Sequence, residues 1–402
     1  MKVIFYLADS LSPSVFFDAQ KKNITSLKNN FINKIKSKSI YFSNCFGYGD
    51  TFASTTPMMT GRNPYEEYAD AFFLINSFKA NNNLSLFFKQ QNFFNVYYSN
   101  IDHKAQINNN EYERYYNLAT QNYDVIQKKK RKLNYNFKNF FDDNNLKSIN
   151  SKYKNIFYFF HEDSMHSDPN VYKNCDAQTY LKSFNKLSRI FENQLSLINY
   201  NKNTDIIYFL SDHGMLLKPY DQIYFNKKLS NENYNSYYKK ILENNKIKFL
   251  FFINNPNQKP ALIKNYTVPE NIFTYVKNNF LNLNKNNNLK TINNKYIIVS
   301  SKSSPKSPYH NFFDKLCFHN HFLYIEKKKR IIFNKKHPEL FVDMIKNIQI
   351  TNKGKINKRL ISTISNYYSF KNKSKKLFFF LITIFFIIKH NVTKRLHFRY
   401  KI

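Results

Sequence analysis

Residues 45–64, CFGYGDTFASTTPMMTGRNP, are the stretch around which the rest of the chain is interpreted. The chain has 5 glycines, of which three lie in this stretch and a fourth, Gly214, follows Ser211-Asp212-His213. Where glycine survives in so glycine-poor a chain, the backbone needs a positive φ or a close approach that a Cβ would block. One of these turns is rich in hydroxyls, and the other carries a carboxylate and an imidazole. A hydroxyl nucleophile beside metal ligands would join the two.

Composition bounds the class of protein and its partners. The 402 residues suffice for one large domain with a full core, and the formal net charge is +35. Such a charge suits nucleic acid or an anionic surface. However, Lys, Asn, Ile, Phe and Tyr are abundant and Trp is absent, which is the residue set of A/T-rich codons. No Arg-rich or aromatic-basic motif stands out, so no nucleic-acid partner is expected. A partner that uses the charge stays open beside codon bias.

Cysteine usage and the N-terminal segment bear on localisation. The 3 cysteines have no metal-type spacing, and an odd, sparse count fits a reducing compartment. The segment MKVIFYLADSLSPSVFF resembles a signal peptide only superficially, because its apolar run breaks at Asp9 and no small-residue cleavage site follows. It is interpreted as a buried first strand. We therefore expect a cytoplasmic protein.

Apolar runs alternate with amphipathic segments, and this pattern predicts an α/β fold with a mostly parallel central sheet flanked by helices. The expected strands are residues 3–7, 39–44, 93–98, 156–160, 205–210, 248–254 and 296–300. The expected helices are residues 74–91, 180–197 and 268–280, with another that starts within 55–59 and holds Pro57 in its first turn. Residues 322–325 and 330–333 predict a small C-terminal hairpin. The polar residues 100–150 are interpreted as an insertion or a cap over the site.

Polar side chains follow three of the expected core strands. Asp9 follows the first strand, the run HEDSMH at 161–166 follows the strand at 156–160, and Ser211-Asp212-His213-Gly214 follows the strand at 205–210. Open α/β sheets bind their ligands at the carboxyl ends of their strands. Simpler alternatives remain: a helix N-cap for Asp9, a solvated loop for 161–166, and an ordinary loop for the hydroxyl-rich turn.

The end of the sequence is a basic tail with a short apolar segment. Residues 377–388, LFFFLITIFFII, lie between lysine-rich flanks. As a helix this segment would reach ~18 Å, short of the ~30 Å hydrocarbon core of a bilayer. Residues 371–402 are therefore expected to anchor the protein peripherally at the inner face of the membrane, with lysines on anionic headgroups. The alternative is a terminal helix docked on the domain.

Taken in chain order, these motifs resemble the sulfatase-like branch of the alkaline phosphatase/sulfatase superfamily. The specific signals are Ser-Asp-His-Gly after an apolar strand and Thr60-Gly61-Arg62-Asn63-Pro64 after a hydroxyl turn. The likeness ends near His337-Pro338-Glu339, after the hairpin. It implies a catalytic domain over residues 1–345, with the tail at 346–402.

The resemblance also implies roles for particular residues. By the position of the family's nucleophile ahead of its Thr-Gly, it selects Thr51 over the neighbouring hydroxyls. It implies a metal site whose ligands are Asp9, Thr51, Asp212 and His213. The candidates for a second metal or for the oxyanion of the substrate are His166, His310 and Asp163. Carboxylate and imidazole ligands favour Zn²⁺, with Mn²⁺ or Ca²⁺ as alternatives and one or two ions bound.

The sequence also departs from the sulfatases. They mature a Cys or Ser in Cys/Ser-x-Pro-Ser-Arg into formylglycine, whereas this chain has Thr51-Phe52-Ala53-Ser54-Thr55, and Ser10 stands where sulfatases often carry a second carboxylate. Since threonine cannot yield the aldehyde, we expect a hydrolase or transferase of phosphate esters, with a small-molecule, lipid or glycan substrate. The alternatives are a sulfuric ester hydrolase without formylglycine and a non-catalytic binder of anionic lipid or polysaccharide.

Overall fold

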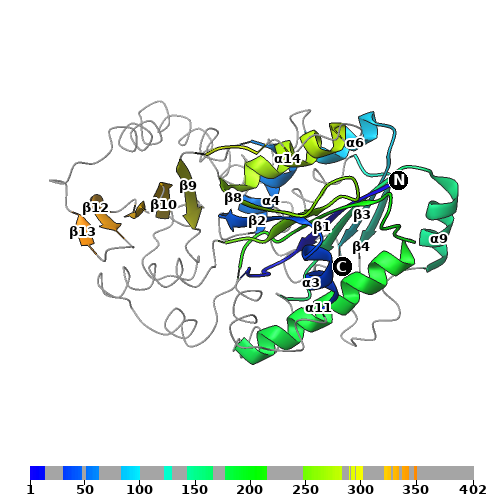
Figure 1. Ribbon diagram of the computed structural model, residues 1–402, viewed down its shortest axis with the longest axis horizontal. Helices are drawn as coiled ribbons and strands as arrows, with labels where there is room; N and C mark the ends of the chain where they lie inside the picture. The colour runs from blue at the N-terminus through cyan, green and yellow to red at the C-terminus, as the bar shows by residue number, and fades with distance from the viewer. Residues whose placement is uncertain are drawn as a thin grey trace, which may run out of the picture.

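The computed structural model describes the greater part of the first 350 residues. The described ranges are 1–13, 30–47, 51–62, 83–99, 122–128, 143–165, 177–214, 248–282, 289, 291–294, 296–301, 321–326, 329–334, 337–343 and 348–350. Within them the chain forms two sheets, of eight and five strands (Figure 1).

The eight-stranded sheet is mostly parallel and has the order β4-β3-β5-β1-β6-β7-β2-β8. Only β7 runs against its neighbours, and every other adjacent pair is parallel. Its strands are β1 (Lys2–Ala8), β2 (Ile40–Cys45), β3 (Phe94–Ser99), β4 (Val125–Lys128), β5 (Ile156–Glu162), β6 (Ile206–Leu210), β7 (Phe251–Asn254) and β8 (Ala261–Thr267). The predicted α/β class is thereby confirmed.

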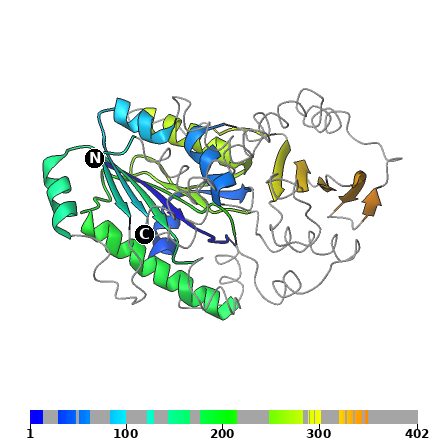
Figure 2. The ribbon, with the colours of Figure 1, turned by 180° about the vertical axis from the view of Figure 1, so that it is seen from behind.

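Helices cover both faces of this sheet. On one face lie α4 (Thr51–Thr60), α6 (Leu84–Gln90) and α14 (Pro269–Leu281); on the other lie α3 (Phe31–Lys36) and α11 (Ala177–Leu197) (Figures 1 and 2). The helix α9 (Asp143–Lys152) packs its Ile149 against the core on the α11 side. The sheet thus separates two apolar cores, one on each face.

The first strand shows why these segments are continuous apolar runs. Val3, Phe5 and Leu7 point into the core under α4, whereas Ile4 and Tyr6 point into the core under α11. A strand that is covered on both faces and paired on both edges has no position at which a polar side chain meets water. The strand expected at 3–7 is therefore a central one, between β5 and β6.

The second sheet is antiparallel and larger than the expected hairpin. It has the order β13-β12-β11-β10-β9, and β10 and β11 pair as the predicted hairpin within it. The strands are β9 (Tyr296–Ser301), β10 (His321–Glu326), β11 (Lys329–Asn334), β12 (His337–Asp343) and β13 (Ile348–Ile350). Because β13 pairs with β12, this sheet runs past residue 345, where the tail was expected to begin.

The helix after the glycine-rich stretch differs from the expectation. It begins at Thr51 rather than within 55–59, so Pro57 lies inside it and not in its first turn. The hydroxyls of Thr55 and Thr60 each donate to the backbone carbonyl four residues earlier, Thr51 O and Thr56 O. Pro57 brings no N–H to the helix, and these two side-chain hydrogen bonds form in the turns before and after it.

Residues 100–150 contain more regular structure than was expected. Their strand β4 forms the outer parallel strand beside β3, and α9 leads into β5. These parts belong to the sheet and its cover, and the expected cap lies outside the described residues. Of the helix expected at 74–91, α6 is the described portion.

The tail beyond Ile350 and its segment 377–388 also lie outside the described residues. Among the helices that the structure describes, none is long and apolar enough to cross a membrane.

Candidate metal centre

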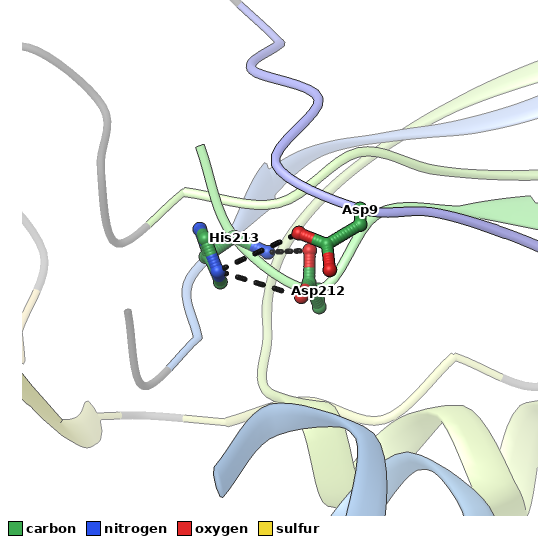
Figure 3. A group of neighbouring side chains, drawn as sticks. All are labelled: Asp9, Asp212 and His213. Carbon is green, nitrogen blue, oxygen red and sulfur yellow. Dashed lines mark hydrogen bonds and ion pairs between the residues drawn. The ribbon is translucent and has the colours of Figure 1, made fainter. Parts of the chain in front are cut away.

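Two adjacent parallel strands deliver the candidate metal ligands to one point. Leu7 near the end of β1 is in register with Leu210 at the end of β6, so Asp9 and Ser211-Asp212-His213 leave the sheet together. Each of Asp9, Asp212 and His213 offers a ligand atom, and these atoms all lie within 4.8 Å of one another (Figure 3). Residues that are roughly 200 positions apart in sequence meet because parallel strands end at the same edge.

The imidazole faces both carboxylates. The distance from His213 Nε2 to Asp212 Oδ2 is 3.4 Å, and that to Asp9 Oδ1 is 3.9 Å. On the other side of the ring, His213 Nδ1 lies 2.7 Å from the Gly214 carbonyl. A proton on Nδ1 makes this hydrogen bond and leaves the Nε2 lone pair directed at the carboxylates. That is the tautomer in which a histidine binds a metal.

The Asp212 side chain is fully buried and its two oxygens are treated differently. Oδ1 accepts hydrogen bonds from the backbone N–H groups of Ser10 at 2.9 Å and of His213 at 2.7 Å. Oδ2 accepts no hydrogen bond from any described residue. Burial, and then the neighbouring Asp9 carboxylate, raise the pKa of Asp212, against smaller lowering effects from His213, Ser10 and Thr51. Two buried carboxylates with an open oxygen and an imidazole lone pair fit a divalent cation.

A tight turn after β1 fixes Asp9. Ser10 has a φ of 61°, in the left-handed region that is uncommon for a residue with a Cβ. Its hydroxyl donates to Asp9 Oδ1 at 2.8 Å, and its carbonyl accepts from the Tyr180 hydroxyl of α11 at 2.7 Å. The Tyr180 hydroxyl in turn accepts a hydrogen bond from Ser12 N at 2.6 Å. Contacts from α11 thus hold the turn in one conformation, and this turn orients the Asp9 carboxylate in advance of ligand binding.

Thr51 reaches the same group from the first residue of α4. Its Oγ1 lies 3.3 Å from Asp9 Oδ2 and 3.4 Å from His213 Nε2. Gly47 lets this segment approach the end of β6, because a Cβ there would stand 3.0 Å from the Asp212 carbonyl and 3.3 Å from Ser54 Oγ. The start of the helix adds a partial positive charge, which favours an anion beside Thr51.

The remaining predicted site residues are placed differently. Asp163 is buried directly after β5, but within the described part of the chain the close metal-ligand group does not include it. His166 and His310 lie outside the described residues, so their predicted roles stay predictions.

His161 is a neighbour of the site that the sequence did not single out. Its Nε2 lies 3.9 Å from Asp9 Oδ2, and its side chain is buried. The strand was expected to end at 160, whereas β5 continues through Glu162. The signal in the sequence is the alternation Phe157, Phe159, His161, which puts the imidazole on the same face as two core phenylalanines.

Comparison with solved structures identifies the fold as that of the alkaline phosphatase superfamily. The phosphonate monoester hydrolase of Agrobacterium radiobacter matches with a TM-score of 0.58 and 8% identity, over 91% of this chain and 96% of that chain. A 2-O GAG sulfatase gives 0.54 and 11%, over 93% and 92%. A protein in the alkaline phosphatase superfamily from Vibrio parahaemolyticus gives 0.51 and 11%, over 92% and 88%.

Comparisons of sequence alone gave a different result from the comparison of structures. No protein-family model and no curated protein matches it. The fold is the one that the motif resemblance predicted, and the solved structures that share it are 8–11% identical to this chain.

Proposed function

We propose that this chain is a metal-dependent, sulfatase-like hydrolase or transferase that acts on a phosphate ester through Thr51. One observation carries the proposal: the Thr51 hydroxyl lies 3.3 Å from Asp9 and 3.4 Å from His213, two of the three residues of the candidate metal centre. A hydroxyl becomes a nucleophile when a metal or a base activates it, and this hydroxyl lies beside residues that could hold a metal or act as a base.

The chain's own residues would prepare the reaction. Asp9, Asp212, His213 and Thr51 would hold one divalent cation, with Zn²⁺ favoured over Mn²⁺ or Ca²⁺ by the mixed carboxylate and imidazole set. When bound, such a cation lowers the pKa of a neighbouring hydroxyl and offsets the charge of a phosphoryl group. Asp9 Oδ2 accepts the Thr51 hydrogen bond and so fixes the direction of the attacking oxygen. The start of α4 would hold the anionic phosphoryl group against it.

The reaction needs no reagent besides the ester and water or an acceptor hydroxyl. A bond forms between Thr51 Oγ and phosphorus while the bond from phosphorus to the leaving oxygen breaks. The Thr51 proton passes to water, and the leaving alkoxide takes a proton from water. Water then cleaves the phosphothreonine, which is hydrolysis, or an acceptor hydroxyl takes the phosphoryl group, which is transfer. His166, His310 or a second ion would neutralise the equatorial oxygens.

The ester that is cleaved separates this proposal from its alternatives. A sulfatase that works without formylglycine would cleave an aryl sulfate faster than an aryl phosphate. A non-catalytic binder of anionic lipid or polysaccharide would cleave neither and would bind without a cation.

The test is to replace Thr51. Thr51→Ala is expected to lower kcat on an aryl phosphate by about 10³-fold or more, because the nucleophile itself is lost. Thr51→Ser retains a hydroxyl and should retain turnover. Thr60→Ala is the matched control, since its hydroxyl bonds within the same helix and away from the site. In the wild type, mass spectrometry after a rapid acid quench should find phosphate on Thr51. Turnover by Thr51→Ala near that of the wild type would refute the nucleophile.

We also propose that residues 371–402 bring the protein to an anionic membrane, which would suit a lipid or envelope-glycan ester as substrate. The support is the basic and apolar pattern of this segment. Removing it should abolish co-sedimentation with vesicles that contain anionic lipid and leave turnover of a soluble aryl phosphate unchanged. Equal co-sedimentation of the shortened and full chains would contradict the anchor.

A further inference from the structure

His161 occupies a position in β5 that lies in the apolar core. Every residue of β5 is buried, and Phe157 and Phe159 on the same face belong to the core under α4. His161 is paired on both edges of its strand, with Leu7 of β1 and with Ser99 of β3. Its backbone is therefore as fixed as any in the sheet.

A polar ring in such a place needs a reason. His161 is 3% exposed and stacks on Phe159 with an interplanar angle of 19°. Burying an imidazole is unfavourable unless it interacts with another polar group. Of the candidate metal ligands, Asp9 faces His161: its Oδ2 lies 3.9 Å from His161 Nε2, within ion-pair distance but beyond hydrogen-bond length.

The two oxygens of Asp9 serve two different neighbours. Oδ1 accepts from the Ser10 hydroxyl at 2.8 Å and lies 3.9 Å from His213 Nε2, so it faces the candidate metal centre. Oδ2 accepts from Thr51 Oγ1 at 3.3 Å and faces His161. A rotation of this carboxylate would move one oxygen away from the cation and the other away from the nucleophile.

His161 faces Asp9 and is not itself one of the candidate metal ligands. Among the described residues, the group whose ligand atoms all lie within 4.8 Å of one another contains Asp9, Asp212 and His213, without His161. Residues that hold a ligand from behind commonly tune metal affinity and ligand orientation.

We infer that His161 is a positioning residue: its imidazole faces Asp9 Oδ2 across 3.9 Å and so favours the orientation of the carboxylate that serves both the cation and Thr51. The inference rests on the proposed function, because it needs a cation at the centre. It gives a role to His161, which begins the polar run 161–166 but is not among the site residues expected from the sequence.

The test measures Zn²⁺ affinity of the full chain by competition with a fluorescent chelator. His161→Phe keeps a flat ring in apolar surroundings and removes the N–H; it should weaken Zn²⁺ binding by about 10- to 100-fold. His161→Gln restores an N–H donor near the position of Nε2 and should bind within about threefold of the wild type. Tyr158→Phe is the matched control, since it removes a hydroxyl from the opposite face of β5, where Asn150 accepts it at 3.0 Å.

Unfolding in the presence of a chelator separates positioning from folding. The metal-free His161→Phe protein should unfold at a urea concentration no lower than the wild type, because a buried polar group has been replaced by an apolar one. At saturating Zn²⁺ its kcat should fall while KM stays unchanged, and His161→Gln should recover kcat.

Each other outcome overturns the inference. His161→Phe with wild-type affinity would show that Asp9 needs no support. Equal losses of affinity in His161→Phe and His161→Gln would show that a polar N–H group at this position is not the cause. A loss matched by lower stability of the metal-free protein would show a role in folding alone. If the wild type itself binds no cation, the proposed function fails, and this assignment fails with it.

Discussion

The two ends of β6 carry one aspartate each, and the contrast between them distinguishes a carboxylate that the protein itself satisfies from a candidate cation ligand. Asp205 precedes the strand, Asp212 follows it, and both are buried. Both also accept a backbone N–H from the neighbouring segment of β1, from Lys2 at 2.7 Å and from Ser10 at 2.9 Å respectively. The two aspartates thus link β1 to β6 in the same way at opposite ends of these two strands.

The difference lies in the second oxygen. Asp205 Oδ2 accepts from Asn201 N at 2.8 Å and lies 3.8 Å from the Lys2 ammonium. Asp212 Oδ2 has no hydrogen-bond donor among the described residues and faces Asp9 and His213. A buried carboxylate that the protein itself satisfies contributes to the fold, whereas one left partly unsatisfied beside another carboxylate fits a cation ligand.

The largest effect should come from Asp212→Asn. The amide keeps an oxygen for Ser10 N and His213 N but places an NH₂ group where the cation would lie. We expect turnover of an aryl phosphate to fall by about 10³-fold or more and bound zinc, measured by elemental analysis, to be lost. Asp205→Asn, the matched change at the other end of β6, should keep both per folded molecule. Equal losses in the two variants would erase the distinction between the two ends.

Added cation should sharpen the same comparison through stability. A ligand that binds only the folded state raises the free energy of unfolding by about 2.7 kcal/mol at one hundred times its dissociation constant. Urea unfolding with and without Zn²⁺ should show this gain in the wild type and in Asp205→Asn. In Asp212→Asn the gain should vanish. A gain that survives in Asp212→Asn would place the cation elsewhere.

The smallest effect should be the cost of Asp205→Asn to the metal-free protein. The substitution replaces Oδ2, which accepts from Asn201 N–H, by an NH₂ group that cannot accept, and it removes the negative charge beside Lys2. Leaving a buried donor unsatisfied costs about 1–3 kcal/mol, so the urea midpoint should fall with the chelator present. Asp212→Asn should lose less under these conditions, because it relieves the repulsion with Asp9. The reverse order would mean that Asp212 is the structural carboxylate.

Much of the fold could be predicted from local pattern. The continuous apolar runs of β1, β5 and β6 can be recognised because they are buried on both faces, and the amphipathic pattern of α11 and α14 marks helices that cover the sheet. The outer strands β4 and β8 were missed. The second of these is largely exposed, with a sequence, ALIKNYT, that has too few apolar residues to indicate a strand.

The chemical groups at the strand ends can be recognised from local sequence, because a core strand that stops in Asp9 or in Ser-Asp-His-Gly is visible without any partner. Thr51 follows from the spacing of a family motif. Which of these groups meet depends on strand order: β1 lies between β5 and β6, so Asp9 meets Asp212, His213 and His161 at one end of the sheet. Local sequence cannot fix that meeting, because the pairing of strands far apart in the chain depends on the packing of both cores.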